Sequence, residues 1–222
     1  MKSFKDYVQE GVNDPSIFKA VFLAGGPGSG KSFIVGQTAL TALGYKVINS
    51  DIPFEVALKK AGLTTNPEDI FSPKGQEVRK DAKKLTSKRL DLALMGRLGL
   101  VIDGTGKDYD KIKKQSDRLR ELGYDISMIF VNTDLETALQ RNRDRSRSLP
   151  DDKVTNMWKG VQTNVGKFQN LFGKFMYIVD NSNGSNWKGA TMSAYKLISK
   201  WSKTEPKNPI AKAWIKKQKS GK

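Results

Sequence analysis

The sequence predicts an α/β fold in which a five-stranded parallel sheet lies between two layers of helices. Five short apolar runs alternate with segments of helical periodicity, and this alternation is typical of parallel strands connected by helices. The runs cover residues 20–24, 45–49, 98–102, 126–131 and 175–179. Polar residues follow the runs, and ligands of such sheets bind beyond the carboxyl ends of the strands. The polar chemistry is therefore expected to gather at one edge of the sheet.

A glycine-rich turn follows the first run and leads into a helix that begins near Lys31. Residues 25–32 read Gly-Gly-Pro-Gly-Ser-Gly-Lys-Ser and satisfy G-x-x-x-x-G-K-[ST], the pattern of a phosphate-binding loop. Glycines let the backbone N–H groups point at an anion, and the helix adds the positive end of its dipole. Lys31 is expected to reach the β- and γ-phosphates of ATP, and Ser32 to ligate Mg²⁺.

This strand–loop–helix context specifies the fold as a P-loop NTPase built as a three-layer sandwich. ATP and Mg²⁺ are the expected cofactors. The residues expected to bind the nucleotide are Gly26, Pro27, Gly28, Ser29, Gly30, Lys31, Ser32 and Asn181.

The helix that follows the loop is expected to end at Gly44, and the second strand ends just before Asp51. A carboxylate there would face the γ-phosphate, where it can accept a proton from an attacking hydroxyl or orient that hydroxyl. Asp51 is therefore the predicted general base. The alternative is that Asp51 only caps a helix over residues 52–61.

Two prolines, each preceded by a polar residue, predict a loop over residues 63–75. A long helix with a basic outer face is expected over residues 76–96. Its predicted buried stripe consists of Val78, Ala82, Leu85, Leu92 and Met95.

The third strand ends in Asp103, the position of the Walker B carboxylate of P-loop proteins. Asp103 is expected to hold Mg²⁺ through water or to bind the substrate, and together with Ser32 it forms the predicted metal site. The alternative is that Asp103 only caps the turn that follows.

A helix over residues 110–122 and the fourth strand precede a capping box at residues 133–136, which opens a helix that ends in four arginines. These are Arg141, Arg143, Arg145 and Arg147. Four guanidinium groups so close together cannot all pack inward, so they lie in solvent or on a polyanion. A mobile lid over residues 141–150 that brings arginines to the transferring phosphoryl group fits this pattern. The alternative is a solvated helix face.

Helical spacing places Arg141 and Arg145 on one face of this segment and Arg143 on another, so only one pair is expected to face the nucleotide. The predicted catalytic residues are Lys31, Asp51, Arg145 and Arg141.

The remaining chain predicts helical segments after Pro150, the fifth strand, and a last helix over residues 184–201. Residues 201–222 carry seven lysines against one glutamate and predict a basic, partly disordered tail, whose Trp214 can stack on a base. The predicted organisation is a leader helix over residues 1–14, a P-loop domain over residues 15–200 and this tail.

The composition limits which partners and which catalytic groups the protein can use. A formal net charge of +16, from 39 Lys and Arg against 23 Asp and Glu, indicates a polyanionic partner such as nucleic acid, with solvated lysines as the alternative. The absence of His and Cys excludes Ser-His-Asp and thiolate catalysis and leaves a carboxylate, a lysine or a tyrosine as general base. No apolar run is long enough to cross a membrane, and we expect a cytoplasmic protein. No oligomeric state is predicted.

Four segments resemble the 5′-hydroxyl polynucleotide kinase domain and its relatives, which include the zeta-toxin kinases and phage kinases that phosphorylate modified bases in DNA. The resemblance covers about residues 18–182 and is carried by residues 25–32, Asn49-Ser-Asp51, Ile102-Asp-Gly-Thr105, and Arg141-Asn-Arg-Asp-Arg145 followed by Leu149-Pro150. It implies a P-loop kinase of this phage-type group, in which Asp51 matches the general base and Arg145 the lid arginine. Lys31 and Ser32 match the ATP and Mg²⁺ residues.

The sequence departs from the polynucleotide kinases in two places. Phe54 stands where they carry an arginine for a substrate phosphate, and Asp103-Gly-Thr resembles the Glu-Gly-Thr of the zeta group. The opening residues resemble the capsid-targeting leader of proteins packaged in large tailed phages, with an ordinary N-terminal helix as the alternative.

These observations together predict an ATP:Mg²⁺-dependent phosphotransferase that acts on a hydroxyl group of a nucleic acid, at a 5′-hydroxyl end or a modified base, or of a nucleotide. One alternative is a zeta-toxin-like kinase of a nucleotide sugar. Another is an ATP-binding, DNA-associated or packaged phage protein that has no acceptor.

Overall fold

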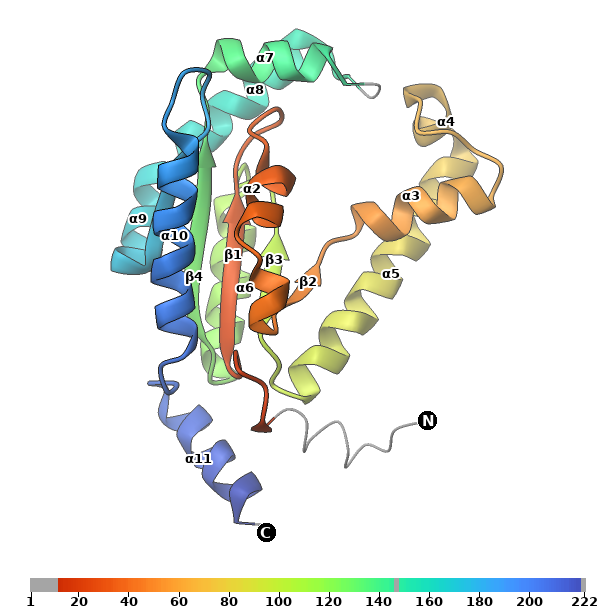
Figure 1. The fold of residues 1–222 in the computed structure, drawn as a ribbon. Coiled ribbons are helices and arrows are strands. Elements are labelled where there is room, and N and C mark those ends of the chain that lie inside the picture. Colours follow the sequence, from red (N-terminus) through yellow and green to blue (C-terminus); the bar gives the residue numbers. More distant parts are fainter. Residues whose placement is uncertain (1–11, 146–147, 221–222) are drawn as a thin grey trace.

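The five predicted strands form one parallel sheet in the computed structural model, which describes residues 12–145 and 148–220 (Figure 1). The strand order is β2-β3-β1-β4-β5, so that β1 is central. The strands are β1 (Lys19–Ala24), β2 (Lys46–Ile48), β3 (Leu100–Asp103), β4 (Asp125–Asn132) and β5 (Met176–Asp180). All six residues of β1 are buried, as expected for a strand covered on both faces.

Helices cover both faces of the sheet, which confirms the three-layer arrangement. Alternate residues of β1 enter two separate cores, with Phe22 in one and Leu23 in the other. The Phe22 core receives α6 (Tyr109–Glu121) and α9 (Val165–Phe172), and the Leu23 core receives α2 (Lys31–Gln37) and α10 (Trp187–Ser202).

The helix predicted to run from Lys31 to Gly44 is interrupted. It consists of α2 and a 3₁₀ turn at Leu40–Leu43, separated by Ala39, whose φ of 43° is incompatible with a continuous right-handed helix. The turn ends at Gly44, as predicted.

Three helices form a lobe beside the sheet, with a small core of its own (Figure 1). They are α3 (Asp51–Lys60), α4 (Pro67–Phe71) and α5 (Pro73–Met95). The loop predicted over residues 63–75 is wrong in part, because α4 lies within it. Each proline is the first residue of its helix, where its missing N–H costs nothing, and the Ser72 side chain accepts a hydrogen bond from the Gly75 N–H at 3.0 Å.

The predicted buried stripe of α5 is also wrong in its second half. Leu85, Leu92 and Met95 are 45%, 67% and 50% exposed, whereas Ala93 and Leu94 are buried against the sheet. Most of α5 leaves the sheet surface and packs mainly on α3 and α4, so its apolar residues do not follow one continuous face (Figure 1).

Two helices lie beyond the carboxyl end of β4, α7 (Leu135–Arg143) and α8 (Asp151–Gln162) (Figure 1). The N-cap of α7 is Asp134, whose carboxylate accepts a hydrogen bond from the Thr137 N–H at 2.6 Å. The capping box was predicted one residue earlier, at Thr133.

The C-terminal segment is an ordered helix, and the prediction of a partly disordered tail is wrong. Helix α11 (Pro209–Lys219) packs near the amino ends of β1 and β4. Ala211 is fully buried there, and the centre of the Trp214 ring lies 5.4 Å from that of the Phe18 ring. Trp214 is therefore used in the core and is not free to stack on a base. Gly123 permits the close approach, because a Cβ there would lie 3.1 Å from the Ala211 nitrogen.

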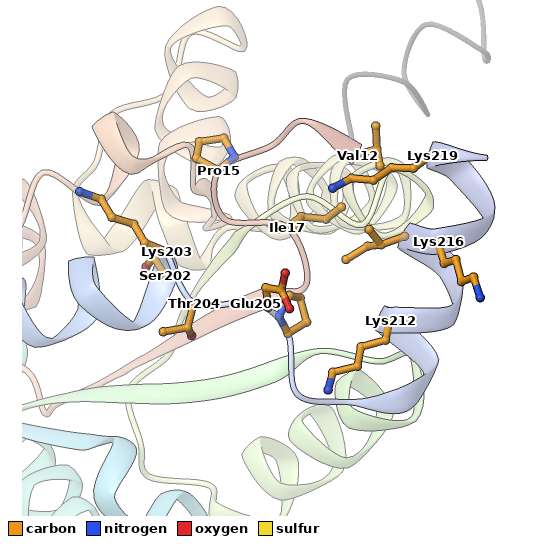
Figure 2. A pocket seen from close by; sticks show the side chains of 12 residues that line it. Val12, Pro15, Ile17, Ser202, Lys203, Thr204, Glu205, Lys212, Lys216 and Lys219 are labelled. Atoms are coloured by element: carbon orange, nitrogen blue, oxygen red, sulfur yellow. The ribbon is translucent and has the colours of Figure 1, made fainter. Parts of the chain in front are cut away.

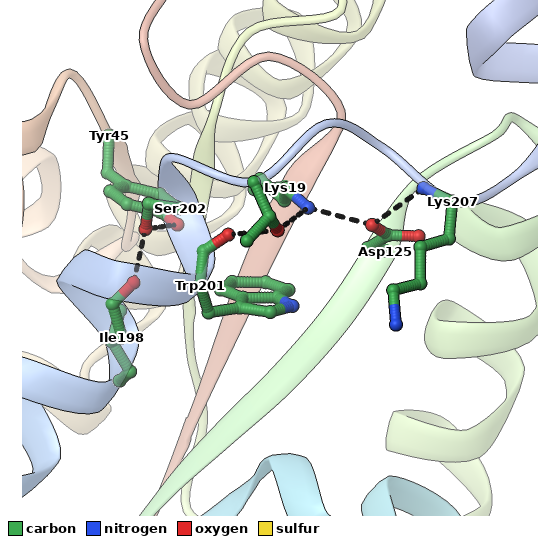
Figure 3. Close-up of polar contacts among 8 residues, drawn as sticks. Lys19, Tyr45, Asp125, Ile198, Trp201, Ser202 and Lys207 are labelled. Atoms are coloured by element: carbon green, nitrogen blue, oxygen red, sulfur yellow. Dashed lines mark hydrogen bonds and ion pairs between the residues drawn. The ribbon is translucent and has the colours of Figure 1, made fainter.

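The connection between α10 and α11 is tied to the sheet by a buried ion pair (Figure 3). The Lys19 ammonium, 1% exposed, lies 2.7 Å from the Asp125 carboxylate and 3.3 Å from the Thr204 hydroxyl. The same carboxylate oxygen accepts the Lys207 N–H at 3.1 Å. Burial lowers the pKa of Lys19, and the hydrogen bond to Asp125 opposes that shift.

Most of the predicted leader helix over residues 1–14 lies outside the described residues. Among the helices that are described, none is long and apolar enough to cross a membrane.

Candidate active site

The phosphate-binding loop connects β1 to α2 and needs glycine for two different reasons. Gly28 and Gly30 adopt φ values of 73° and 78°, which side chains other than glycine rarely adopt. A Cβ at Gly28 would collide with the Ala138 carbonyl of α7, and one at Gly30 would lie 2.5 Å from the Asn181 amide nitrogen. The loop is thus packed closely between α7 and the end of β5.

Asn181 supports the loop from behind. Its side-chain amide is buried and donates a hydrogen bond to the Ser29 carbonyl at 2.8 Å. It does not line the cavity in front of the loop. The predicted nucleotide-binding residue is therefore placed as a support of the loop backbone.

Lys31 is half-buried at the start of α2, and its ammonium donates a hydrogen bond to the Gly25 carbonyl at 2.8 Å. Burial lowers the pKa of Lys31, while the Asp103 carboxylate nearby opposes the shift. A phosphate bound in front of the loop would give this ammonium a further negatively charged partner besides Asp103.

A cavity of about 150 Å³ lies in front of the loop. It is lined by residues 26–32 of the loop, by residues 103–105 after β3, and by Arg145. The structure thus brings together Lys31, Ser32, Asp103 and Arg145, which the sequence placed in one site.

Asp103 has the properties of a metal or substrate ligand. Its Oδ2 accepts a hydrogen bond from the Asn49 side chain at 2.7 Å, whereas its Oδ1 is buried without a hydrogen-bond partner within the described chain. Desolvation by burial raises the pKa of this carboxyl, and Lys31 opposes the shift. An unpartnered carboxylate oxygen beside Ser32 and the loop fits Mg²⁺ bound together with phosphates, and Asp103 makes no capping contact.

Among the described residues, no group of three or more acidic side chains could hold a metal ion alone. Ser32 and Asp103 would therefore need the phosphate oxygens of a nucleotide to complete the coordination of Mg²⁺.

Asp51 is the first residue of α3, and Ser50 before it is the N-cap, so Asp51 does not cap this helix. Its carboxylate is exposed, and its N–H donates to the Asn49 Oδ1 at 2.6 Å. Asn49 therefore links the Asp103 carboxylate to the backbone N–H of Asp51, one through each end of its side-chain amide. The sequence motif contained Asn49, but the pattern alone did not indicate this bridging role.

A second and larger cavity, of about 510 Å³, opens beside the first, between α5 and α6. Residues 103–105 line both cavities, so the two spaces meet at the end of β3. The polar side chains of its helical walls are Lys83, Thr86, Ser87, Lys111 and Gln115. None of these was predicted, because exposed lysines on a basic helix face look the same in a sequence whether or not they face a cavity.

The lid arginines point to different partners. Arg145 lines the loop cavity, Arg141 donates a hydrogen bond to the Asn183 side chain at 3.2 Å, and Arg143 pairs with Asp151.

The side-chain amide of Asn142, which is 2% exposed, accepts a hydrogen bond from the N–H of Leu149 and donates one to its carbonyl. It thereby holds the two ends of the arginine segment together. Arg147 lies outside the described residues.

Replacing Arg145 with alanine is expected to lower kcat more than it weakens ATP binding, by on the order of 10²-fold or more, because the guanidinium meets charge that develops in the transition state. Arg143→Ala is the matched control, since its side chain is engaged by Asp151 and does not line the cavity. Steady-state kinetics and nucleotide titration of both variants test this. Equal losses in the two variants would contradict the assignment.

Comparisons with known proteins give a family and a fold. A sequence profile described as AAA domain matches residues 21–164, well over half of the chain. A search of curated proteins finds no match. At this distance the solved structures carry information on the fold alone.

Three of the similar solved structures serve as examples. The match with a chain of the AvrRxo1-ORF1:AvrRxo1-ORF2 complex covers 79% of this chain and 61% of that chain, at 16% identity and a TM-score of 0.57. The match with a chain of the Pnkp1/Rnl/Hen1 RNA repair complex covers 68% of this chain and 46% of that chain, at 20% identity and a TM-score of 0.53. The match with a chain of the PezAT toxin–antitoxin system of Streptococcus pneumoniae covers 90% of this chain and 93% of that chain, at 16% identity and a TM-score of 0.50.

The similarity in fold, the complete phosphate-binding loop and the parallel sheet agree with one another. The chain belongs to the AAA domain family and has a P-loop kinase-like fold.

Proposed function

We propose that the protein is an ATP- and Mg²⁺-dependent phosphotransferase that phosphorylates a hydroxyl group on a nucleic acid, at a 5′-hydroxyl end or a modified base, or on a nucleotide. The observation that carries this proposal is the meeting of the two cavities at residues 103–105. A phosphate-binding loop that only hydrolysed ATP would need no second polar cavity at that point. A transferase needs one, because the acceptor must approach the γ-phosphoryl group.

The residues of the chain take separate roles in this reaction. The loop N–H groups, Lys31 and Arg145 bind and orient the phosphates, and Ser32 and Asp103 hold the metal ion. Asp51 accepts the proton of the acceptor hydroxyl as its oxygen bonds to phosphorus, and ADP departs with the electrons of the broken P–O bond. Bound ATP and Mg²⁺ supply the phosphoryl group and the neutralisation of its charge.

Lys83 of α5 and Lys111 of α6 both line the second cavity, which we call the acceptor cavity, and they favour an acceptor that itself carries a phosphate. The double variant Lys83→Ala/Lys111→Ala is expected to raise the KM for the acceptor by roughly 10-fold or more and to leave the KM for ATP unchanged. The matched control is Lys84→Ala/Lys114→Ala, which removes two exposed lysines of the same helices that do not line the cavity. Similar KM values in both double variants would rule out this acceptor cavity.

Offering γ-labelled ATP to several acceptors tests the proposed function directly. The set contains 5′-hydroxyl oligonucleotides, DNA with modified bases, mononucleotides and UDP-N-acetylglucosamine. Label on a nucleic acid or a nucleotide would support the proposal, whereas label on the nucleotide sugar alone would favour a zeta-toxin-like kinase. Transfer to none of them would favour an ATP-binding protein without an acceptor.

A further inference from the structure

A third cavity lies beside α11 (Figure 2), at the opposite end of the sheet from the β1–α2 connection that forms the phosphate-binding loop (Figure 1). It has a volume of about 430 Å³ and lies between the segment before β1, the α10–α11 connection and α11. Its apolar floor includes Ile17, Pro206 and Ile215, and four lysines line it. These are Lys203, Lys212, Lys216 and Lys219. We call this cavity with its four lysines the lysine groove.

Among the described residues, little negative charge offsets the four lysines of the lysine groove. Glu205 is the one acidic residue that lines it, and none of the four lysines makes an ion pair in the part of the chain that the structure describes. Charges of one sign around a concave surface focus the field and attract anions.

The lysines are held on a rigid support. Lys212, Lys216 and Lys219 lie four and three residues apart, so they share one face of α11 and span about 10 Å along it. The opposite face is fixed by Ala211 and Trp214 in the core. Lys19 and Asp125 hold the connection that carries Lys203 (Figure 3).

From this arrangement we infer that the lysine groove binds the phosphate backbone of a nucleic acid. A row of ammonium groups along a helix matches a polymer with repeated phosphates better than one small anion. A membrane surface is disfavoured, because stable binding of a basic helix to lipid also needs an apolar face that inserts, and the central apolar residues of α11 are packed against the core. Binding would be independent of base sequence, because ammonium groups that contact phosphates do not read the base edges.

The groove is a second site and not part of the acceptor cavity. It lies at the amino end of β1, whereas the phosphate-binding loop follows the carboxyl end, and the six residues of this strand span roughly 20 Å. Nucleic acid held there would leave both cavities of the candidate active site open. Its binding is also independent of the proposed phosphoryl transfer, which keeps the two proposals separately testable.

Titrating labelled single-stranded and double-stranded oligonucleotides with the full-length protein at several salt concentrations tests this inference. The variant Lys212→Gln/Lys216→Gln/Lys219→Gln is expected to flatten the log–log salt dependence by roughly 2 to 3, because each lost phosphate contact contributes about 0.7–0.9. At ~0.1 M salt the same relation predicts an affinity loss of about 10²-fold. The thermal midpoint and ATP turnover without polymer should stay unchanged.

The matched control is Lys188→Gln/Lys196→Gln/Lys200→Gln, which removes the same charge from exposed positions of α10. It is expected to leave the salt dependence nearly unchanged. An equal effect of the two triple variants would show that only net charge matters and would overturn the inference. Binding of the wild-type protein to vesicles containing phosphatidylserine, but to neither oligonucleotide, would overturn it as well.

Discussion

Replacing Lys31 with alanine is expected to abolish phosphoryl transfer, with kcat reduced on the order of 10³-fold or more, since the ammonium meets the charge of the transferring group. The protein should remain folded. Among the described residues this ammonium donates one hydrogen bond, to the Gly25 carbonyl, and it forms no ion pair, and burial lowers its pKa. Its removal takes a favourable charge away from the nearby Asp103 carboxylate but breaks no direct side-chain contact. Transfer of labelled phosphate and the thermal midpoint measure the two effects.

Lys46→Ala is the matched control, because Lys46 is an exposed lysine of β2 at the other end of the sheet. It is expected to retain activity. A folded Lys31→Ala protein with full transferase activity would refute the kinase proposal, whatever the acceptor.

Replacing Asp51 with asparagine is expected to lower kcat by ~10²–10⁴-fold and to leave ATP binding little changed, because the amide cannot accept a proton. The effect on stability should be small. Ser50 is the N-cap of α3, so only the favourable interaction of an acidic side chain with the helix N-terminus is lost, about 0.3–1 kcal/mol. Steady-state kinetics and thermal unfolding separate these effects. Near-normal turnover would show that Asp51 is not the base.

Asp103→Asn is the informative comparison for Asp51. Asparagine can still accept the hydrogen bond from Asn49, and it removes a charge that burial disfavours, since the pKa of the Asp103 carboxyl is raised. A raised pKa in the folded state means that the ionised carboxylate destabilises the fold above its ordinary pKa, so the variant should be more stable at neutral pH. If Asp103 holds the metal ion, the Mg²⁺ concentration for half-maximal activity rises in this variant and not in Asp51→Asn.

The central part of the fold could be predicted because its signals are local. The apolar runs of the five strands and the glycine pattern of residues 25–32 have few alternative structures, and the parallel sheet is confirmed. Asp103 and Arg145 follow predicted elements, so their approach to the loop cavity could be expected from topology.

Other features depend on packing that the local pattern does not encode. Pro67 and Pro73 are each compatible with a loop or with a helix start, and in the structure each opens a helix that contributes to the small core of the lobe. The segment around α11 resembles a solvated tail because residues 201–222 carry seven lysines against one glutamate, yet Ala211, Trp214 and Ile215 dock it on the core. Lys83 and Lys111 line one cavity only because the tertiary fold brings α5 and α6 to its wall, although the two residues are far apart in the sequence.

The contact of Trp214 with Phe18 also has a consequence for the synthesis of the protein. Phe18 directly precedes β1, the central strand, and its ring packs on Trp214, which lies almost 200 residues later in the sequence. Contacts between residues so far apart in sequence form late in folding. The pocket around Phe18 and Gly123 therefore stays open until residue 214 has left the ribosome. A nascent chain that stalls after β5 would contain all five strands and still expose this apolar surface, which makes it a substrate for chaperones.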